Sequence, residues 1–158
     1  MLNRAGLHLI NYPNYSQMQS ACRNSCFTET SLFHLFDSIY SNADEKNAAL
    51  LVVLDLSAAF DTVDHTILIN RLHDEFGLQN TALSWFKSYL SYRTQYIKVG
   101  RHRSPNFSLD SGVPQGSVLG PLLFTVYTSP ISSLISNYPS ISFQLYADDI
   151  QLCIGISK

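Results

Sequence analysis

Three aspartates stand at positions where their side chains could act together. Asp55 lies at the end of a short apolar run, and Asp148 and Asp149 lie side by side between two other strand-like runs. A bare charge beside a buried strand is costly, and no Lys or Arg lies within several residues of either position along the chain. Adjacent carboxylates repel one another unless a cation neutralises them, so the pattern predicts a divalent metal as their partner.

Hard oxygen ligands suit Mg²⁺, which proteins usually hold with one or two carboxylates together with substrate phosphates. Two such ions would activate an attacking hydroxyl and stabilise a leaving pyrophosphate, the two-metal scheme of nucleotidyl transfer. We therefore expect two Mg²⁺ ions, replaceable by Mn²⁺, and a phosphate-bearing substrate. An alternative stays open, in which Asp148 and Asp149 only form a turn and Asp55 only caps the residues after the strand.

The order of the acids argues against two other classes of aspartate chemistry. A phosphatase with an aspartate nucleophile needs a second Asp two residues after Asp55, where Ser57 stands. A phospho-acceptor receiver domain carries its acid pair on an early strand and its single Asp later, which is the reverse of the order in this chain.

Hydrophobic periodicity predicts the elements that position these acids. The apolar run Ala48–Leu56 does not alternate, which is typical of a strand buried on both faces. Two further strands, joined in a tight hairpin with the acid pair at its tip, are predicted over Ile141–Tyr146 and Ile150–Ile156. The other predicted elements are a helix from Thr28 to Ile39, a helix from its cap Asp64 to its stop Gly77, a helix over Thr81–Tyr89, a hairpin of Thr94–Val99 with Phe107–Leu109, and an apolar helix opened by the glycine-rich segment Gly112–Gly120.

The composition fits one α/β domain with a substantial core. The chain has 158 residues, of which 46% are hydrophobic and 14% are charged, and its formal net charge is −2. This balance gives no overall sign of a nucleic-acid binder. Half of the ten basic residues nevertheless fall in one window without Asp or Glu, namely Lys87, Arg93, Lys98, Arg101 and Arg103. This basic patch either contacts a nucleic-acid backbone or forms a solvated hairpin face.

The cysteines and the amino end bear on the compartment. Cys22, Cys26 and Cys153 are an odd number, and the amino end lacks a basic segment followed by an apolar one. We therefore expect an intracellular protein, in the nucleus or the cytoplasm. Cys22 and Cys26 are spaced like the start of a zinc site, but only His34 lies nearby. No apolar run approaches the roughly twenty residues of a membrane span, so no membrane partner is expected.

Three segments carry the chemistry in one order along the chain. They are LDLSAAFDTVDH (Leu54–His65), SGVPQGSVLGPLLF (Ser111–Phe124) and LYADDIQL (Leu145–Leu152). Together they resemble the reverse transcriptases of non-LTR (LINE-type) retrotransposons, and the likeness runs from about Gln19 through Ile156. The resemblance implies a polymerase palm-like antiparallel sheet backed by helices. It also implies RNA-directed DNA polymerase activity on an RNA template, a DNA primer and deoxynucleoside triphosphates.

The resemblance assigns roles to residues around the first segment. It implies that Asp55, Asp148 and Asp149 are the catalytic, metal-binding carboxylates and that the backbone carbonyl of Leu56 lies near a metal. Phe60 falls where the family has an aromatic steric gate, which crowds a ribose 2′-hydroxyl and so favours deoxynucleotides. The alternative for Phe60 is an ordinary core aromatic.

The other segments carry further implied contacts. Gln115 and Gly116 match the family loop that touches the incoming nucleotide and the template, where glycine allows close approach of the backbone. A plain loop leading into a helix is the alternative. Tyr146 and Ala147 correspond to positions close to the primer end, and the alternative for Tyr146 is ordinary strand packing.

Upstream, QSACRNSCFTETSLFHLF resembles the family's fingers segment, in which an arginine approaches the template or the triphosphate. Arg23 occupies that position. The surrounding pattern departs from the family, because Ala21 and Cys22 replace a glycine and an aromatic, and Asn24 and Ser25 replace a proline and a glycine. This departure leaves the role of Arg23 open.

We divide the chain into an irregular lead-in (1–16), a partial fingers segment (17–47) and a palm core (48–158). The resemblance implies that this core is truncated before the thumb and that the endonuclease region of a full-length element is missing. Weak or no processive synthesis is therefore expected from this chain alone. The competing hypothesis is a catalytically inactive retrotransposon remnant or partner-binding fragment, which metal affinity and primer extension would separate from a polymerase.

Overall fold

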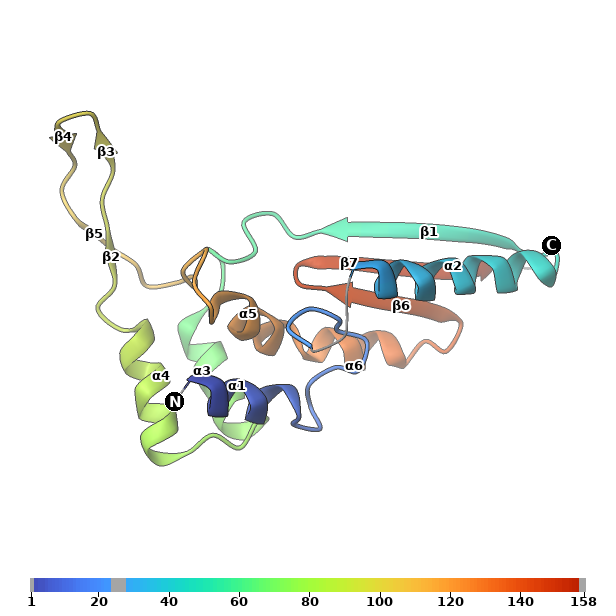
Figure 1. Ribbon diagram of the computed structural model, residues 1–158, viewed down its shortest axis with the longest axis horizontal. Coiled ribbons are helices and arrows are strands. Elements are labelled where there is room, and N and C mark those ends of the chain that lie inside the picture. Colours follow the sequence, from blue (N-terminus) through green and yellow to red (C-terminus); the bar gives the residue numbers. More distant parts are fainter. Residues whose placement is uncertain (1, 24–27, 157–158) are drawn as a thin grey trace.

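The computed structural model describes residues 2–23 and 28–156 (Figure 1). Its elements follow in the order α1 (Leu2–Ile10), α2 (Thr28–Asp44), β1 (Ala48–Asp55), α3 (His65–Asp74), α4 (Asn80–Leu90), β2 (Thr94–Gln95), β3 (Lys98–Val99), β4 (His102–Arg103), β5 (Phe107–Ser108), α5 (Gly120–Thr128), α6 (Pro130–Ser136), β6 (Ile141–Tyr146) and β7 (Asp149–Ile156). Figure 1 shows a sheet at one end, a cluster of helices at the other, and a hairpin that stands away from both. No described helix is both long enough and apolar enough to cross a membrane.

The main sheet has the strand order β1-β7-β6, and both pairings are antiparallel. Helix α2 contacts all three strands, and α6 contacts β6. Leu35 of α2 and Cys153 line one cavity, whereas Ile131 of α6 and Ile150 line another. Because side chains alternate along a strand, Cys153 and Ile150 point to opposite faces of β7. The two helices therefore cover opposite faces, which confirms the expected antiparallel sheet backed by helices.

The principal core lies beside the sheet, where α3 packs against α4 and α5. Its largest fully buried side chains are Leu9, Tyr15, Val63, Leu68, Leu72, Phe76, Phe86, Leu123 and Val126. Helix α5 is apolar nearly all round, and five consecutive residues from Leu122 to Val126 are buried. A helix of this kind is surrounded by other elements, and α5 accordingly anchors the loop that precedes it.

Residues 2–10 form helix α1, so the prediction of an irregular lead-in over residues 1–16 is wrong for this part. Leu9 is fully buried, and Ala5, one turn earlier, packs against the core. A nine-residue helix is marginal in isolation, and most of its stability comes from packing of its apolar side. The Leu2, Ala5 and Leu9 spacing is the sequence signal that could have revealed it.

Strand β1 forms over the predicted residues, but it is not buried on both faces. Leu50 is 47% exposed, Val53 57% and Leu54 44%. The strand lies at the edge of the sheet, where β7 is its only described strand partner. An unalternating apolar run favours a strand that is covered on both faces, and the described residues do not supply that cover. The acid that follows this run consequently lies in a solvent-exposed position.

Helix α3 begins at the predicted cap. Asp64 has extended backbone angles, and its Oδ1 accepts a hydrogen bond from the Ile67 N–H at 2.9 Å. We expect Asp64→Ala to lower the free energy of unfolding by about 1 kcal/mol, because a helix-end N–H loses its partner. Asp64→Asn keeps a capping oxygen, so its free energy of unfolding should stay within about 0.3 kcal/mol of the wild-type value. Urea unfolding measures both, and equal losses in the two variants would contradict a capping role.

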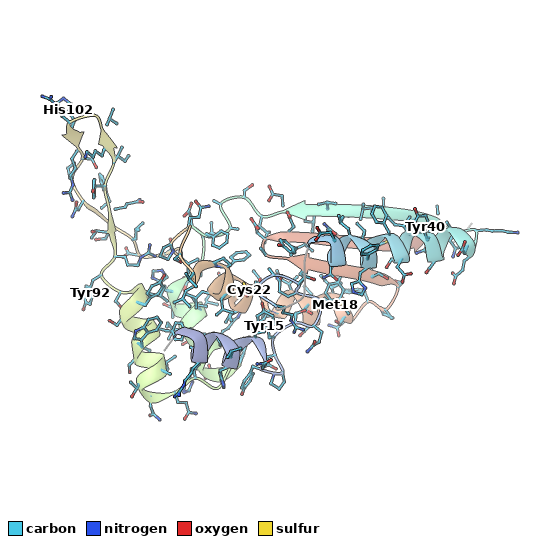
Figure 2. All side chains as sticks on the ribbon, in the orientation of Figure 1. Tyr15, Met18, Cys22, Tyr40, Tyr92 and His102 are labelled. Carbon is cyan, nitrogen blue, oxygen red and sulfur yellow. The ribbon has the colours of Figure 1, made fainter. Side chains whose placement is uncertain are left out.

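The predicted hairpin after α4 is confirmed, although its strands are interrupted. β2 pairs with β5 and β3 pairs with β4, so the ribbon is held by two short ladders. Figure 2 shows His102 at its tip and Tyr92 at its base. Arg103 stacks its guanidinium over the Tyr96 ring, with Cζ 3.7 Å from the ring centroid. This cation–π contact rigidifies an otherwise exposed ribbon.

Candidate active site

The strand register brings the three aspartates to one end of the sheet. Asp55, the last residue of β1, lies directly opposite Asp149, the first residue of β7. Tyr146 pairs with Asp149 on the other side, and Ala147 and Asp148 form the connecting turn. Figure 1 shows the end of β1 beside this turn. A cross-strand acid pair with a third acid in the adjoining turn is therefore the central feature of the site.

The solvent exposure of these acids differs from the expectation. Asp55 and Asp149 are exposed, and Asp148 is half-buried. The argument from the cost of a buried charge is therefore wrong for the exposed pair. Repulsion remains, because like charges directly opposite on antiparallel strands are destabilising. Both ion pairs among the described residues lie at the C-terminal end of α3, so no described Lys, Arg or His pairs with the three acids.

The donor set can be compared with what metals require. Within residues 2–23 and 28–156, no three His, Cys, Asp or Glu side chains form a group that could hold a metal ion. The acids thus form an open pair with a neighbour, not a closed cage. Mg²⁺ is commonly held by one or two carboxylates, with waters and substrate phosphates completing its shell. Hard oxygens at an open sheet end fit such an ion.

The segment after β1 joins the acids to the loop before α5. The Leu56 carbonyl accepts a hydrogen bond from the Ala59 N–H at 3.2 Å, which leaves its second lone pair for another donor or a cation. Phe60 is half-buried, with its ring centroid 5.3 Å from that of Phe124. Its carbonyl accepts from the Val113 N–H at 2.7 Å. Phe60 therefore packs on the core and also lies in the segment that leads out of the acid site.

Gly112 is the junction of this region. Its N–H donates to the Val63 carbonyl at 2.8 Å, and its carbonyl accepts from His65 Nε2 at 2.8 Å and from Arg93 Nη1 at 2.9 Å. Gln115 and Gly116 follow in an exposed loop. Gly116 has φ +76°, and a Cβ added there would meet nothing within 4 Å. The space above Gly116 is open to an approaching molecule.

Arg23 is held by its own segment. Its Nη1 donates to Gln17 Oε1 at 2.9 Å, its Nη2 donates to the Ser16 carbonyl at 3.2 Å, and its Cζ lies 5.3 Å from the Tyr15 ring centroid. Its Nε is buried without a hydrogen-bond partner. Figure 2 shows Tyr15 and Cys22 in this segment. Cys26, Asn24 and Ser25 of the predicted fingers pattern lie outside the described residues.

One residue at the site carries no sequence-based prediction. Gln19 is 3% exposed, and its side-chain amide contacts the backbone of Ala147 in the acidic turn. A buried glutamine gives no periodic signal, and its partner lies 128 positions away along the chain. The only hint in the sequence is that Gln19 opens the segment with the family resemblance.

The five basic residues do not form one equivalent patch. Arg93 is half-buried and bound to Gly112, and Arg103 donates to Asn106 Oδ1 at 2.8 Å while it stacks on Tyr96. Lys87 lies on α4, whereas Lys98 and Arg101 lie on the projecting hairpin, and all three are exposed. Arg93 therefore serves the fold of the loop, and the exposed cations remain available to solvent.

The family model and the curated relatives that match this chain are all reverse transcriptases or retrotransposon polymerases. Residues 2–157 match the family model described as "Reverse transcriptase (RNA-dependent DNA polymerase)". The chain is 33% identical over 138 residues to the probable RNA-directed DNA polymerase from transposon BS of Drosophila melanogaster. This match covers 85% of the chain and 15% of the relative. It is 33% identical over 112 residues to the RNA-directed DNA polymerase from mobile element jockey of the same species, covering 67% and 12%.

A more distant relative is the retrovirus-related Pol polyprotein from type-1 retrotransposable element R2 of Popillia japonica. It is 25% identical over 148 residues, covering 87% of the chain and 20% of that protein. The chain thus spans between 12% and 20% of the length of these curated relatives. The family match covers nearly the whole chain, and it includes α1, which precedes the segment where the resemblance begins. The chain belongs to the reverse transcriptase family, in its non-LTR retrotransposon branch.

Proposed function

We propose that this chain is the palm core of an RNA-directed DNA polymerase, and that it extends a DNA primer on an RNA template. The observation that carries the proposal is the register of Asp55 opposite Asp149, with Asp148 in the adjoining turn. Family membership supports the same conclusion. Within this proposal, residues 17–47 are a partial fingers segment and residues 48–158 are the palm.

Asp55, Asp149 and Asp148 would hold Mg²⁺, with the Leu56 carbonyl as a further oxygen donor. When bound, the ions supply Lewis-acid activation of the primer 3′-hydroxyl and stabilisation of the leaving pyrophosphate. The 3′-oxygen forms a bond to the α-phosphorus of the deoxynucleotide, the bond from that phosphorus to pyrophosphate breaks, and the hydroxyl proton passes to solvent. The exposed acids keep coordination positions open to the phosphates of the substrate.

The incoming nucleotide would lie between the acids and the loop that contains Gln115 and Gly116. The open space at Gly116 supports this assignment, because a side chain there would occupy the volume that a phosphate or a base approaches. Phe60, whose ring packs on Phe124, would present its remaining exposed edge to the ribose as a steric gate. A rigid backing of this kind suits a gate, since a mobile ring would not exclude a hydroxyl group.

Nucleic acid would be gripped by exposed cations. Lys87, Lys98 and Arg101 are available to neutralise phosphates, a contact that gives affinity without reading sequence. Arg103 and Arg93 would contribute less, because both already have partners. Tyr146, which pairs with Asp149, would lie near the primer end together with Ala147.

The contacts of Arg23 favour a different role from the one that the resemblance implies. Its guanidinium is occupied by Gln17, Ser16 and Tyr15, so an approach to template or triphosphate would require these contacts to break. We assign Arg23 to the stability of the segment before α2. This assignment leaves nucleotide contacts to the loop before α5.

Extension of a labelled DNA primer on an RNA template with Mg²⁺ tests the proposal. We expect short extension products from the wild-type chain, none with EDTA in place of Mg²⁺, and none from the Asp148→Asn, Asp149→Asn double variant. Products of a few nucleotides are expected, because little of the described surface could grip a duplex. Mn²⁺ should replace Mg²⁺, since it accepts the same oxygen ligands.

A metal-independent product, or equal product from the double variant, would exclude this chemistry. Absence of product from every protein, with normal folding of wild type by circular dichroism, would favour the inactive-remnant hypothesis for this chain. A DNA template run in parallel would show whether the activity depends on RNA.

A further inference from the structure

The acidic turn is anchored to a segment that is remote in sequence. Residues 18–20 run along the free edge of β6, where the Ser20 N–H donates to the Leu145 carbonyl and the Leu145 N–H donates to the Met18 carbonyl, each at 3.0 Å. The Gln19 and Leu145 backbones form a parallel bridge. Figure 2 shows Met18, with Tyr15 and Cys22, in the segment that joins α1 to α2. This backbone pairing delivers the Gln19 side chain to the end of the β6–β7 hairpin.

The Gln19 amide binds the turn through both of its polar atoms. Its Oε1 accepts hydrogen bonds from the Ala147 N–H and the Ala21 N–H, each at 3.0 Å, and its Nε2 lies 3.4 Å from the Ala147 carbonyl. The side chain is 3% exposed, so water does not compete with these bonds. Gln19 therefore holds the N–H and approaches the C=O of the residue directly before Asp148.

Ala147 is the residue of the turn that most requires external support. Its φ is +53°, a left-handed conformation that a residue with a Cβ adopts at an energetic cost. Such a conformation persists only where surrounding contacts over-determine it. The direction of the Asp148 and Asp149 side chains follows from the angles at Ala147, because it is the first residue of the two-residue connection.

We infer that Gln19 is a positioning residue for the acidic turn: it holds Ala147 in the left-handed conformation that sets the placement of Asp148 and Asp149 beside Asp55. The inference rests on the proposed function, because the direction of the acids matters only if they bind metal. Mg²⁺ demands near-ideal octahedral geometry, so small rotations of a carboxylate reduce its affinity. Gln19 itself contacts neither substrate nor metal in this scheme.

The wild-type chain alone provides the first test. Amide hydrogen exchange of metal-free protein, followed by NMR, should show the Ala147 N–H protected to a similar degree as the Leu145 N–H, which has a backbone acceptor. An unsupported turn amide would exchange far faster than a strand amide. Rapid exchange of Ala147 beside a protected Leu145 would overturn the inference without any variant.

The second test compares two glutamines. Gln19→Met removes the amide that contacts Ala147, whereas Gln144→Met removes another buried amide, which donates to Ser20 Oγ at 2.5 Å. We expect Gln19→Met to speed exchange at Ala147 and to weaken Mn²⁺ binding by about fivefold, the worth of one hydrogen bond. Gln144→Met should keep the wild-type Mn²⁺ affinity within about twofold, on the same scale. Mn²⁺ titration monitored by electron paramagnetic resonance measures the affinities.

The possible results separate the two proposals. Wild-type protein that binds no Mn²⁺ would defeat the proposed function and the positioning role with it. Binding by wild type with equal affinity in Gln19→Met would defeat only the positioning role, as would equal weakening in both glutamine variants. A loss confined to Gln19→Met supports the inference.

Discussion

Replacing Gly112 with alanine is expected to lower the free energy of unfolding by about 3 kcal/mol, a large share of the stability of a small domain. Gly112 has φ +83°, and a Cβ there would lie 3.0 Å from both the Cα and the carbonyl oxygen of Asp61. These are backbone atoms, which cannot rotate away as a flexible side chain can. The substitution would therefore push apart the segment after β1 and the loop before α5.

The consequences of Gly112→Ala should extend beyond stability. The Gly112 carbonyl accepts from His65 and Arg93, and its N–H donates to Val63, so three parts of the chain meet there. Displacement of this junction would loosen Gln115 and Gly116, which follow it in the loop. We therefore also expect weaker nucleotide use by any variant that still folds.

Gly116→Ala is the matched control. Gly116 has a similar φ of +76°, but an added Cβ would meet nothing within 4 Å. Its expected cost is about 1 kcal/mol, from backbone conformation alone. Urea unfolding of both variants at one protein concentration measures the difference. Equal costs for the two substitutions would contradict a close backbone approach at Gly112.

Sequence alone was sufficient for most elements, including the hairpin whose tip carries Asp148 and Asp149. The cap at Asp64, the hairpin after α4 and the two strands that flank the acid pair follow from local chemistry, namely side-chain capping, turn residues and apolar runs. Local rules of this kind concern neighbours along the chain. They are therefore reliable wherever the stabilising contact is also local.

Contacts between distant segments could not be predicted in the same way. The burial of β1 depends on what covers it, and an apolar run does not distinguish a covered strand from an exposed edge. Helix α1 is stable because Leu9 packs into a core built by later helices. The register of Asp55 with Asp149 and the hydrogen bond from Ala147 to Gln19 both join segments far apart along the chain. The acids were recognisable as residue types, whereas their arrangement required the fold.

The exposed setting of the acid pair leads to the last expectation, which concerns Asp55→Asn. Without metal, the substitution removes a like charge directly opposite Asp149 and should raise the free energy of unfolding by about 0.5 kcal/mol. With Mg²⁺ the wild type should become the more stable of the two proteins. A ligand that binds only the folded state stabilises it in proportion to its occupancy, and the variant has lost one of the carboxylates that bind the ion. Primer extension should fall by at least about a hundredfold, since a metal ion contributes several kcal/mol to stabilisation of the transition state.

Asp110→Asn provides the control, because Asp110 is an exposed acid that belongs to none of the three strands of the main sheet. It should leave both extension and the effect of Mg²⁺ on stability unchanged. Urea unfolding in EDTA and in Mg²⁺ measures the stability of each protein without and with metal, and primer extension measures its activity. A purely structural Asp55 would show the opposite pattern, with lower stability in EDTA and the same gain from Mg²⁺ as wild type. Opposite signs for stability and activity arise only where unfavourable charges are kept together to bind a cation, so this variant separates a working metal site from a hairpin that merely contains acids.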